Sequence, residues 1–263
     1  MIRKLFAGSV VLVYLSSNLI ASQAGKMSLK TRGSVEIGVQ TYKYKYEEEV
    51  DGASFMEESG PKYGFSVTGI ERFADEYYAI ADIRYATGDV SYSSASGTGD
   101  VTDKVYEARL LVGKEAEVEN YLLSSYTGVG YRMLKNDLRD LGIGGYRRTS
   151  QYIYIPIGIL HRFHAGSSGR ISTSIEYDYL AWAKQTSYYS DIDPLLIDIA
   201  NKQKHGYGAR ISSAYEQEDW SIGLFLNYWK IGDSELNDYY YPIVIWEPKN
   251  ETKEYGVQLK YRF

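Results

Sequence analysis

The sequence predicts an all-β fold, an antiparallel up-and-down barrel of about ten strands, and three observations lead to it. From Ser34 onward, apolar and polar residues alternate with the period of two that is typical of strands. The connections between these segments are alternately short and long. Charged residues fall at mid-strand on the non-apolar face, where they would be costly in the dry core of a soluble sandwich. A transmembrane barrel with a polar interior accommodates all three observations.

The composition is consistent with a β-rich membrane protein. Hydrophobic residues make up 44% of the 263-residue chain, but tyrosine is unusually frequent, with 28 Tyr against 7 Phe and 4 Trp. Tyrosine combines an apolar ring with a polar tip, which explains a mean hydropathy of only −0.36. The absence of cysteine excludes disulfides and thiol chemistry. The net charge of −5 argues against nucleic acid as a partner.

Residues 1–24 have the features of a secretory signal peptide. Arg3 and Lys4 precede a mostly apolar stretch, and Ser22-Gln23-Ala24 supplies small residues for cleavage. Polar residues at 16–18 interrupt the apolar run well before the roughly 20 residues that a membrane-spanning helix needs. We therefore expect an exported protein whose residues 25–263 form one outer-membrane barrel domain.

The ten predicted strands cover residues 34–46, 62–73, 77–90, 103–114, 120–134, 150–163, 170–184, 205–217, 220–231 and 252–263. In the sixth strand, Ile153, Ile155, Ile157 and Ile159 form an apolar face, and in the ninth Ile222, Leu224 and Leu226 do so. The last strand is the clearest, because Tyr255, Val257, Leu259, Tyr261 and Phe263 alternate with Gly256, Gln258, Lys260 and Arg262. We expect the apolar faces to contact lipid.

The loops fix the orientation of the barrel. Long connections cover about 47–61, 91–102, 135–149, 185–204 and 232–251, whereas the connections between them are short. With an even number of strands, both termini and the short turns lie on the periplasmic side, and the five long loops are extracellular.

The inward faces carry both signs of charge. We predict a lumen network of ion pairs formed by Asp82, Arg84, Glu107, Arg109, Arg132, Glu176, Asp178 and Arg210. The inward aromatic residues are expected to be Tyr126, Tyr152, Tyr154, Trp182, Phe225 and Trp229. A ten-stranded barrel is only slightly wider than one that its own side chains fill, so we expect a largely plugged lumen. A narrow porin-like channel is the alternative.

The C-terminal sequence resembles that of bacterial outer-membrane β-barrels. The chain ends in Phe263, preceded at alternate positions by Tyr261 and Leu259, and this ending resembles the signal read by the barrel assembly machinery. Residues 145–158 are also similar to a pattern in a family of small, mostly uncharacterised outer-membrane barrel proteins. That resemblance implies the barrel fold but no particular activity.

No catalytic motif of known barrel enzymes is complete. Asp191 and Asp193 have the spacing of one omptin-like protease pair, but no Asp stands two residues before a His. The sequence from His164 to Arg170 has the wrong spacing for an outer-membrane phospholipase. We therefore expect no enzymatic activity, no catalytic residues, no cofactor and no metal, with a rim hydrolase as the third hypothesis.

The long loops carry the candidate recognition residues, Tyr188, Tyr189, Tyr239, Tyr240, Tyr241 and Trp246. Aromatic clusters of this kind favour recognition. We expect a surface protein whose loops bind, adhere or shield, with an extracellular ligand or surface protein as partner. The other expected partners are outer-membrane lipid or lipopolysaccharide and, during biogenesis, the assembly machinery. The sequence 193–200 is also expected to form a short helix capped by Asp193.

Overall fold

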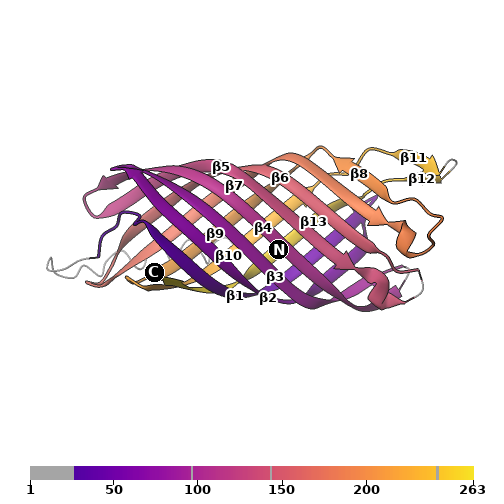
Figure 1. The fold of residues 1–263 in the computed structure, drawn as a ribbon, viewed down its shortest axis with the longest axis horizontal. Helices are drawn as coiled ribbons and strands as arrows, with labels where there is room; N and C mark the ends of the chain where they lie inside the picture. Colours follow the sequence, from indigo (N-terminus) through magenta and orange to yellow (C-terminus); the bar gives the residue numbers. More distant parts are fainter. Residues whose placement is uncertain (1–26, 96, 143, 241–242) are drawn as a thin grey trace.

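The computed structural model describes residues 27–95, 97–142, 144–240 and 243–263, so the predicted signal peptide lies outside the described residues. Ten long strands slant around the long axis of an elongated molecule (Figure 1). They are β1 (Ser34–Val50), β2 (Ala53–Ala74), β3 (Tyr77–Ser94), β4 (Gly97–Val118), β5 (Tyr121–Asp137), β6 (Arg147–Ala165), β7 (Gly169–Tyr188), β9 (Gly206–Glu216), β10 (Trp220–Ile231) and β13 (Lys249–Arg262). Shorter elements are η2 (Leu138–Leu141), η3 (Tyr189–Asp191), β8 (Ile199–Gln203), β11 (Asn237–Tyr240) and β12 (Ile243–Ile245).

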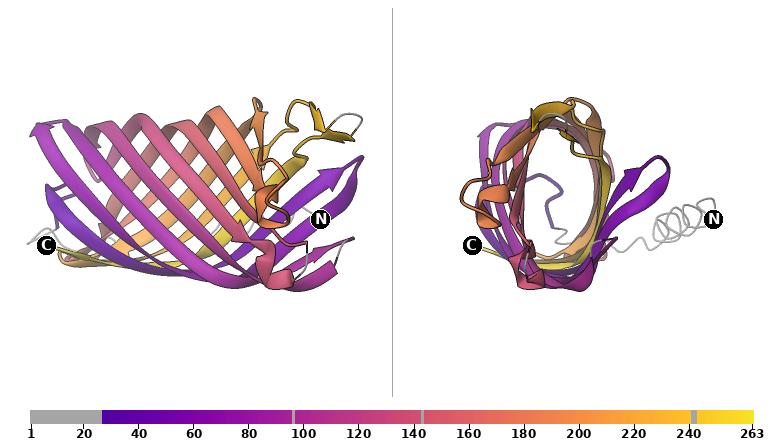
Figure 2. Two further views of the ribbon diagram at one scale, coloured as in Figure 1. Left: turned by 45° about the vertical axis from the view of Figure 1, so that its right-hand side comes forward. Right: turned by 90° about the vertical axis from the view of Figure 1, so that its right-hand side faces the viewer.

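The strands form a closed antiparallel barrel. Each long strand pairs with its neighbours in sequence, and β1 pairs with β13 to close the wall. Seen along the axis, the wall is a continuous oval (Figure 2). The extra strand β8 pairs with the upper part of β7, from Ala183 to Ser187. The predicted fold class, an antiparallel up-and-down barrel of ten strands, is confirmed.

Several strands extend well beyond their predicted ends on the long-loop side. Residues 47–61 were expected to be a loop, but β1 and β2 continue to a tight turn at Asp51 and Gly52, whose φ angles are 51° and 82°. Both angles lie in the left-handed region that two-residue hairpin turns require and that Asp-Gly adopts readily. Residues 91–94 and 97–102 likewise form the end of the β3–β4 hairpin.

The outer face has an apolar band between two aromatic belts. The predicted lipid-facing residues Ile153, Ile155, Ile157, Ile159, Ile222, Leu224 and Leu226 are all exposed on it. Near the short turns lie the ring pairs Phe73–Tyr77, Tyr215–Trp220 and Tyr261–Phe263. On the other side, near the long loops, lie Phe65–Tyr85–Tyr106 and Tyr177–Tyr207–Tyr228. Such belts mark the two interfaces of a bilayer.

Leu224 lies within this band and offers a test of it. Replacing Leu224 with arginine is expected to cost about 2–4 kcal/mol in the free energy of unfolding, because the guanidinium would face hydrocarbon. Urea unfolding from lipid vesicles measures this cost. Lys230→Arg, on the same strand above the band, is the control and is expected to change nothing; equal costs for the two variants would place the bilayer elsewhere.

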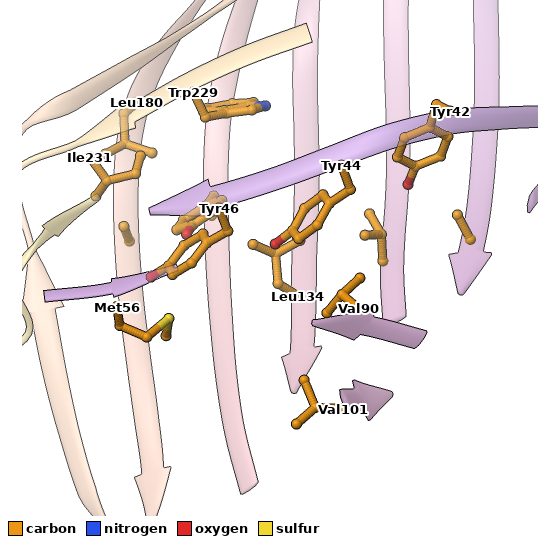
Figure 3. Packing of buried hydrophobic residues seen from close by; sticks show 14 of the residues in the cluster. Tyr42, Tyr44, Tyr46, Met56, Val90, Val101, Leu134, Leu180, Trp229 and Ile231 are labelled. Carbon is orange, nitrogen blue, oxygen red and sulfur yellow. The ribbon is translucent and has the colours of Figure 1, made fainter. Parts of the chain in front are cut away.

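The buried core lies inside the barrel, in the half that carries the long loops. Tyr42, Tyr44 and Tyr46 of β1 pack there with Trp229 and other apolar side chains from across the lumen (Figure 3). Tyr152 and Tyr154 join this cluster, and Phe225 packs against its edge. The indole of Trp229 lies 5.8 Å from the ring of Tyr152 and 5.0 Å from that of Tyr154.

Two local predictions were wrong. Trp182 was expected inside, but a register shift between Ile153 and Tyr154 pairs Ile153 with Trp182 and Tyr154 with Leu180. The extra residue in β7 is a β-bulge, which reverses the facing of the residues after it, so Ala183 is the buried one.

Residues 193–200 form no helix; the Asp193 carboxylate instead accepts a hydrogen bond from the Leu195 amide, and β8 begins at Ile199.

No helix among the described residues is long and apolar enough to cross a membrane.

Candidate functional site

A cluster of buried ion pairs fills the lumen just below the aromatic core. Arg84 donates to Glu254 at 2.9 Å, and Arg132 donates to the other oxygen of Glu254 at 2.6 Å. Arg84 also contacts Glu107 at 3.2 Å. Arg132 and Glu254 are fully buried, and these contacts join β3, β4, β5 and β13.

The second half of the network centres on Arg210 of β9. Its guanidinium contacts Asp178 at 2.7 Å, Glu176 at 3.2 Å and Glu107 at 2.5 Å. Arg109 pairs with Glu176 from the opposite wall. Because Glu107 contacts both Arg84 and Arg210, the two halves form one network across the lumen.

The structure brings together seven of the eight residues predicted for this network. The exception is Asp82, which lies opposite Arg109 in the strand register but accepts a hydrogen bond from Thr68 at 2.7 Å. Sequence reasoning missed Glu254 and Asn227, which donates to it. Tyr154 was predicted to face inward, and its hydroxyl donates to Glu107. The alternation of β13 places Glu254 on the same inward face as Gly256, so the sequence pattern could have predicted Glu254 as a lumen residue.

The short-turn end of the lumen, periplasmic in the predicted orientation, contains the start of the described chain. Residues 27–33 enter the barrel (Figure 2), and the Leu29 side chain is buried there. Glu115 accepts from the Thr31 amide at 2.9 Å, Arg162 donates to the Leu29 carbonyl at 2.8 Å, and Arg170 donates to the Ser28 carbonyl at 2.6 Å. These bonds hold the segment as a plug in the mouth, beside a small cavity of about 220 Å³.

A larger cavity, of about 560 Å³, opens among the long loops; we call it the extracellular cavity after the predicted orientation of the barrel. Its walls include the aromatic side chains of Phe55, Tyr92, Tyr146, Tyr189 and Trp246. Tyr146 and Tyr189 lie with ring centroids 4.8 Å apart. The ion-pair cluster and the aromatic core separate this cavity from the periplasmic one.

Charged and polar groups form the floor of the extracellular cavity. Arg148 donates to Glu247 at 2.7 Å and also to Glu48, so one guanidinium serves two carboxylates. Arg148 Nε and the Asn201 side-chain oxygen are buried, and neither has a hydrogen-bond partner among the described residues. Arg148 and Asn201 both line the cavity.

Burial raises the pKa of the Glu247 carboxyl well above its ordinary value; Arg148 opposes this shift, and the negative charge of Glu48 adds to it. Glu247 lies above the apolar band, outside the membrane-spanning segments.

The raised pKa of Glu247 predicts that the free energy of unfolding depends on pH. As the pH rises above about 4.3, the ordinary glutamate value, the unfolded chain releases the proton while the folded chain retains it. The folded state then loses stability until the pH exceeds the folded pKa. Replacing Glu247 with glutamine removes this loss, so urea midpoints of the variant are expected to fall less with pH than those of the wild type. Urea midpoints that fall equally with pH in the variant and in the wild type would contradict a raised pKa of Glu247.

The predicted loop aromatics lie in different places. Tyr189 and Trp246 line the extracellular cavity, whereas Tyr188 lies on the outer wall near Arg147. Tyr239 and Tyr240 belong to β11. Tyr241 lies outside the described residues. At the other end of the molecule, Leu259, Tyr261 and Phe263 are exposed on the outer face.

The partial hydrolase motifs are not assembled into a site. Asp191 pairs with Arg147 at 2.8 Å, and the carboxylate of Asp193 is used in its own turn. His164 is near the end of β6, at a short periplasmic turn. Over the described ranges, no group of three or more His, Asp or Glu side chains is arranged to hold a metal ion.

The chain was compared with protein families, curated proteins and solved structures. No family model and no curated protein matches the chain. Among solved structures, the outer membrane protease OmpT from Escherichia coli has a TM-score of 0.50 at 12% identity, covering 90% of this chain and 100% of that one. An outer membrane channel from Pseudomonas putida F1 has a TM-score of 0.42 at 8% identity, with coverages of 93% and 100%. Ail, the attachment invasion locus protein of Yersinia pestis, has a TM-score of 0.37 at 11% identity, with coverages of 89% and 100%.

The likeness to OmpT establishes the fold of a bacterial outer-membrane β-barrel for this chain. At such low identity it says nothing of activity, which has to be argued from the residues themselves.

Proposed function

We propose that the protein is a non-enzymatic barrel of the bacterial surface that binds an extracellular ligand in the cavity among its long loops. The observation that carries the proposal is the combination of an open aromatic cavity above and a lumen filled by buried ion pairs below. Aromatic walls provide stacking surface. Arg148 and Asn201 add polar groups to the lining, which suits a ligand that carries hydroxyl groups.

The alternative of a narrow channel is less well supported by the lumen. Arg132, Asp178, Trp229 and Glu254 are fully buried at successive points across it. Permeation would require several of these side chains to separate, and each separation would leave buried charges without partners. A rim hydrolase would need a nucleophile or an activated water at the cavity, and the partial motifs do not converge there.

Binding to immobilised glycans and extracellular matrix proteins tests the proposal. Barrels reconstituted in liposomes are expected to bind one class above the level of empty liposomes, and Trp246→Ala should remove that binding. Trp220→Ala, which alters the periplasmic aromatic belt, is the matched control and should bind as the wild type does. Equal binding by all three proteins, or hydrolysis of added peptide or lipid substrates, would contradict the proposal.

The C-terminal residue is proposed to act in assembly through the barrel assembly machinery. Phe263 is exposed and its ring lies 4.9 Å from that of Tyr261, so it is accessible from outside the barrel. Deleting Phe263 is expected to lower the amount of folded protein in outer-membrane fractions and to increase periplasmic degradation. Unchanged insertion kinetics after the deletion would argue against this role.

A further inference from the structure

The outer wall of the barrel has a groove that the proposed ligand cavity does not use. The groove, about 560 Å³ in volume, runs over β4, β5 and β6 and is lined by outward side chains including Lys104, Tyr106, Met133, Lys135 and Gln151. Its upper rim is formed by Asp140 and Arg147. It therefore has a cationic upper part and an aromatic and apolar lower part.

Two lysines in this groove face each other across neighbouring strands. Lys104 of β4 and Lys135 of β5 are direct partners in the strand register, and both are exposed. Like charges directly opposite each other destabilise a sheet unless something neutralises them. Within the described part of the chain, no carboxylate lies within ion-pair distance of either lysine.

Three other outward lysines at this end of the barrel have acidic partners, whereas Lys43, Lys184 and Lys202 have none among the described residues, and Lys184 and Lys202 are also direct register partners. Lys45 lies 2.9 Å from Glu57, Lys230 lies 3.0 Å from Glu251, and Lys249 lies 2.8 Å from Glu49.

The acidic groups around the groove do not neutralise the two lysines. Asp137 is bound by Arg139 at 2.6 Å, and Asp191 is bound by Arg147 at 2.8 Å. Asp140 is exposed at the rim. A concentration of unneutralised positive charge therefore remains at Lys104 and Lys135.

The height of the groove indicates what covers it. Tyr106 lies at its lower edge and belongs to the upper aromatic belt, with its ring 5.1 Å from that of Tyr85. Below it on the same two strands, Leu110 and Val129 face the lipid. The lysines therefore lie above the aromatic belt, beyond the residues that contact hydrocarbon. This is the level of lipid headgroups, where the positive charge of the lysines attracts anionic groups.

We propose that this groove binds a phosphorylated glycolipid of the outer leaflet, with a headgroup phosphate between Lys104 and Lys135. The phosphate supplies the negative charge that the opposed lysines lack. The acyl chains lie along the apolar band below Tyr106. The Gln151 amide nitrogen donates to the Tyr131 hydroxyl at 2.7 Å, which leaves the Gln151 side-chain oxygen to accept from a headgroup hydroxyl. This site is separate from the extracellular cavity, and the two proposals succeed or fail independently.

Native mass spectrometry of the folded, micelle-solubilised protein with lipid A tests the inference. The wild type is expected to retain bis-phosphorylated lipid A and to release a dephosphorylated form of the same lipid. Each lysine-to-alanine change should weaken binding roughly fivefold, and Lys104→Ala with Lys135→Ala about 25-fold, from the typical worth of one basic residue near a membrane surface. Lys230→Ala is the matched control, because Lys230 is also outward and exposed but is paired with Glu251; it should bind as the wild type does.

Heat-modifiable mobility on gels shows that each variant is folded before its binding is compared. Inorganic phosphate at the same concentration should not displace the lipid. Displacement by inorganic phosphate would show a free-anion site and overturn the lipid assignment. Equal retention of the phosphorylated and dephosphorylated lipids, or unchanged binding in the double variant, would overturn the phosphate site.

Discussion

Replacing Arg210 with alanine is expected to destabilise the barrel by about 3–5 kcal/mol, the usual cost of removing one partner from a buried ion-pair network. Arg210 contacts Glu107, Glu176 and Asp178. Glu107 and Glu176 keep a second arginine, Arg84 and Arg109 respectively. Asp178, which is fully buried, would be left without a positive partner, and this explains the size of the effect.

Urea unfolding from lipid vesicles measures the loss, with Asp100→Ala as the control. Asp100 is exposed near the extracellular end of β4 and bonds only to Ser91, at 3.0 Å, among the described residues, so its removal should cost less than about 1 kcal/mol. The loss of stability in Arg109→Ala should lie between those of Arg210→Ala and Asp100→Ala. The double variant Arg210→Met with Asp178→Leu should recover most of the loss, because it leaves no unpaired charge. Equal midpoints for Arg210→Ala and Asp100→Ala would mean that the lumen is well hydrated.

Replacing Trp229 with alanine is the second change with a large expected effect, about 3–5 kcal/mol. The indole is fully buried at the centre of the aromatic layer, against Tyr152 and Tyr154. It also lies 5.9 Å from the guanidinium of Arg132 and 5.7 Å from that of Arg210. Its removal therefore opens a cavity and takes away two cation–π contacts.

Trp246→Ala is the matched control for Trp229→Ala. Trp246 is 40% exposed on the wall of the extracellular cavity, so its loss should cost no more than about 1 kcal/mol. The same urea titration compares the two variants. A cost for Trp229→Ala as small as that for Trp246→Ala would mean that the aromatic layer does not close the lumen.

The barrel could be predicted because the lipid imposes a strict alternation on the outer face. The strand ends could not, because that alternation reverses at the membrane boundary. In β1 the outward residues Val35, Ile37 and Val39 are apolar, whereas further on the apolar residues Tyr44 and Tyr46 face inward. Above the membrane the outer face is wet, so lysine and glutamate occupy it and the segment resembles a loop in sequence.

The lumen network could be predicted only in part, because alternation gives the facing of a residue but not its distance across the barrel. Asp82 and Arg109 are opposite in register, yet Arg109 reaches across the lumen to Glu176. No local pattern reveals such a contact. The bulge in β7 that turns Trp182 outward is equally invisible in the alternation, since one extra residue leaves no mark of its own.

The extracellular cavity is a further feature that the sequence indicated only through its aromatic residues. Tyr189 and Trp246 were identified as loop residues, but the floor is built from Glu48 and Arg148 on the extended strands and from Glu247. The strand extensions that the sequence concealed are what bring these charges together.

Planar-bilayer conductance tests the central claim, that the lumen is closed and function resides at the surface. The wild type is expected to give no steady single-channel current. A variant lacking residues 27–33 should also give none, because the ion-pair cluster and aromatic core close the lumen above the periplasmic plug. A steady current in the wild type, with an ion selectivity that changes when Arg109 or Glu176 is neutralised, would contradict the account and establish a channel.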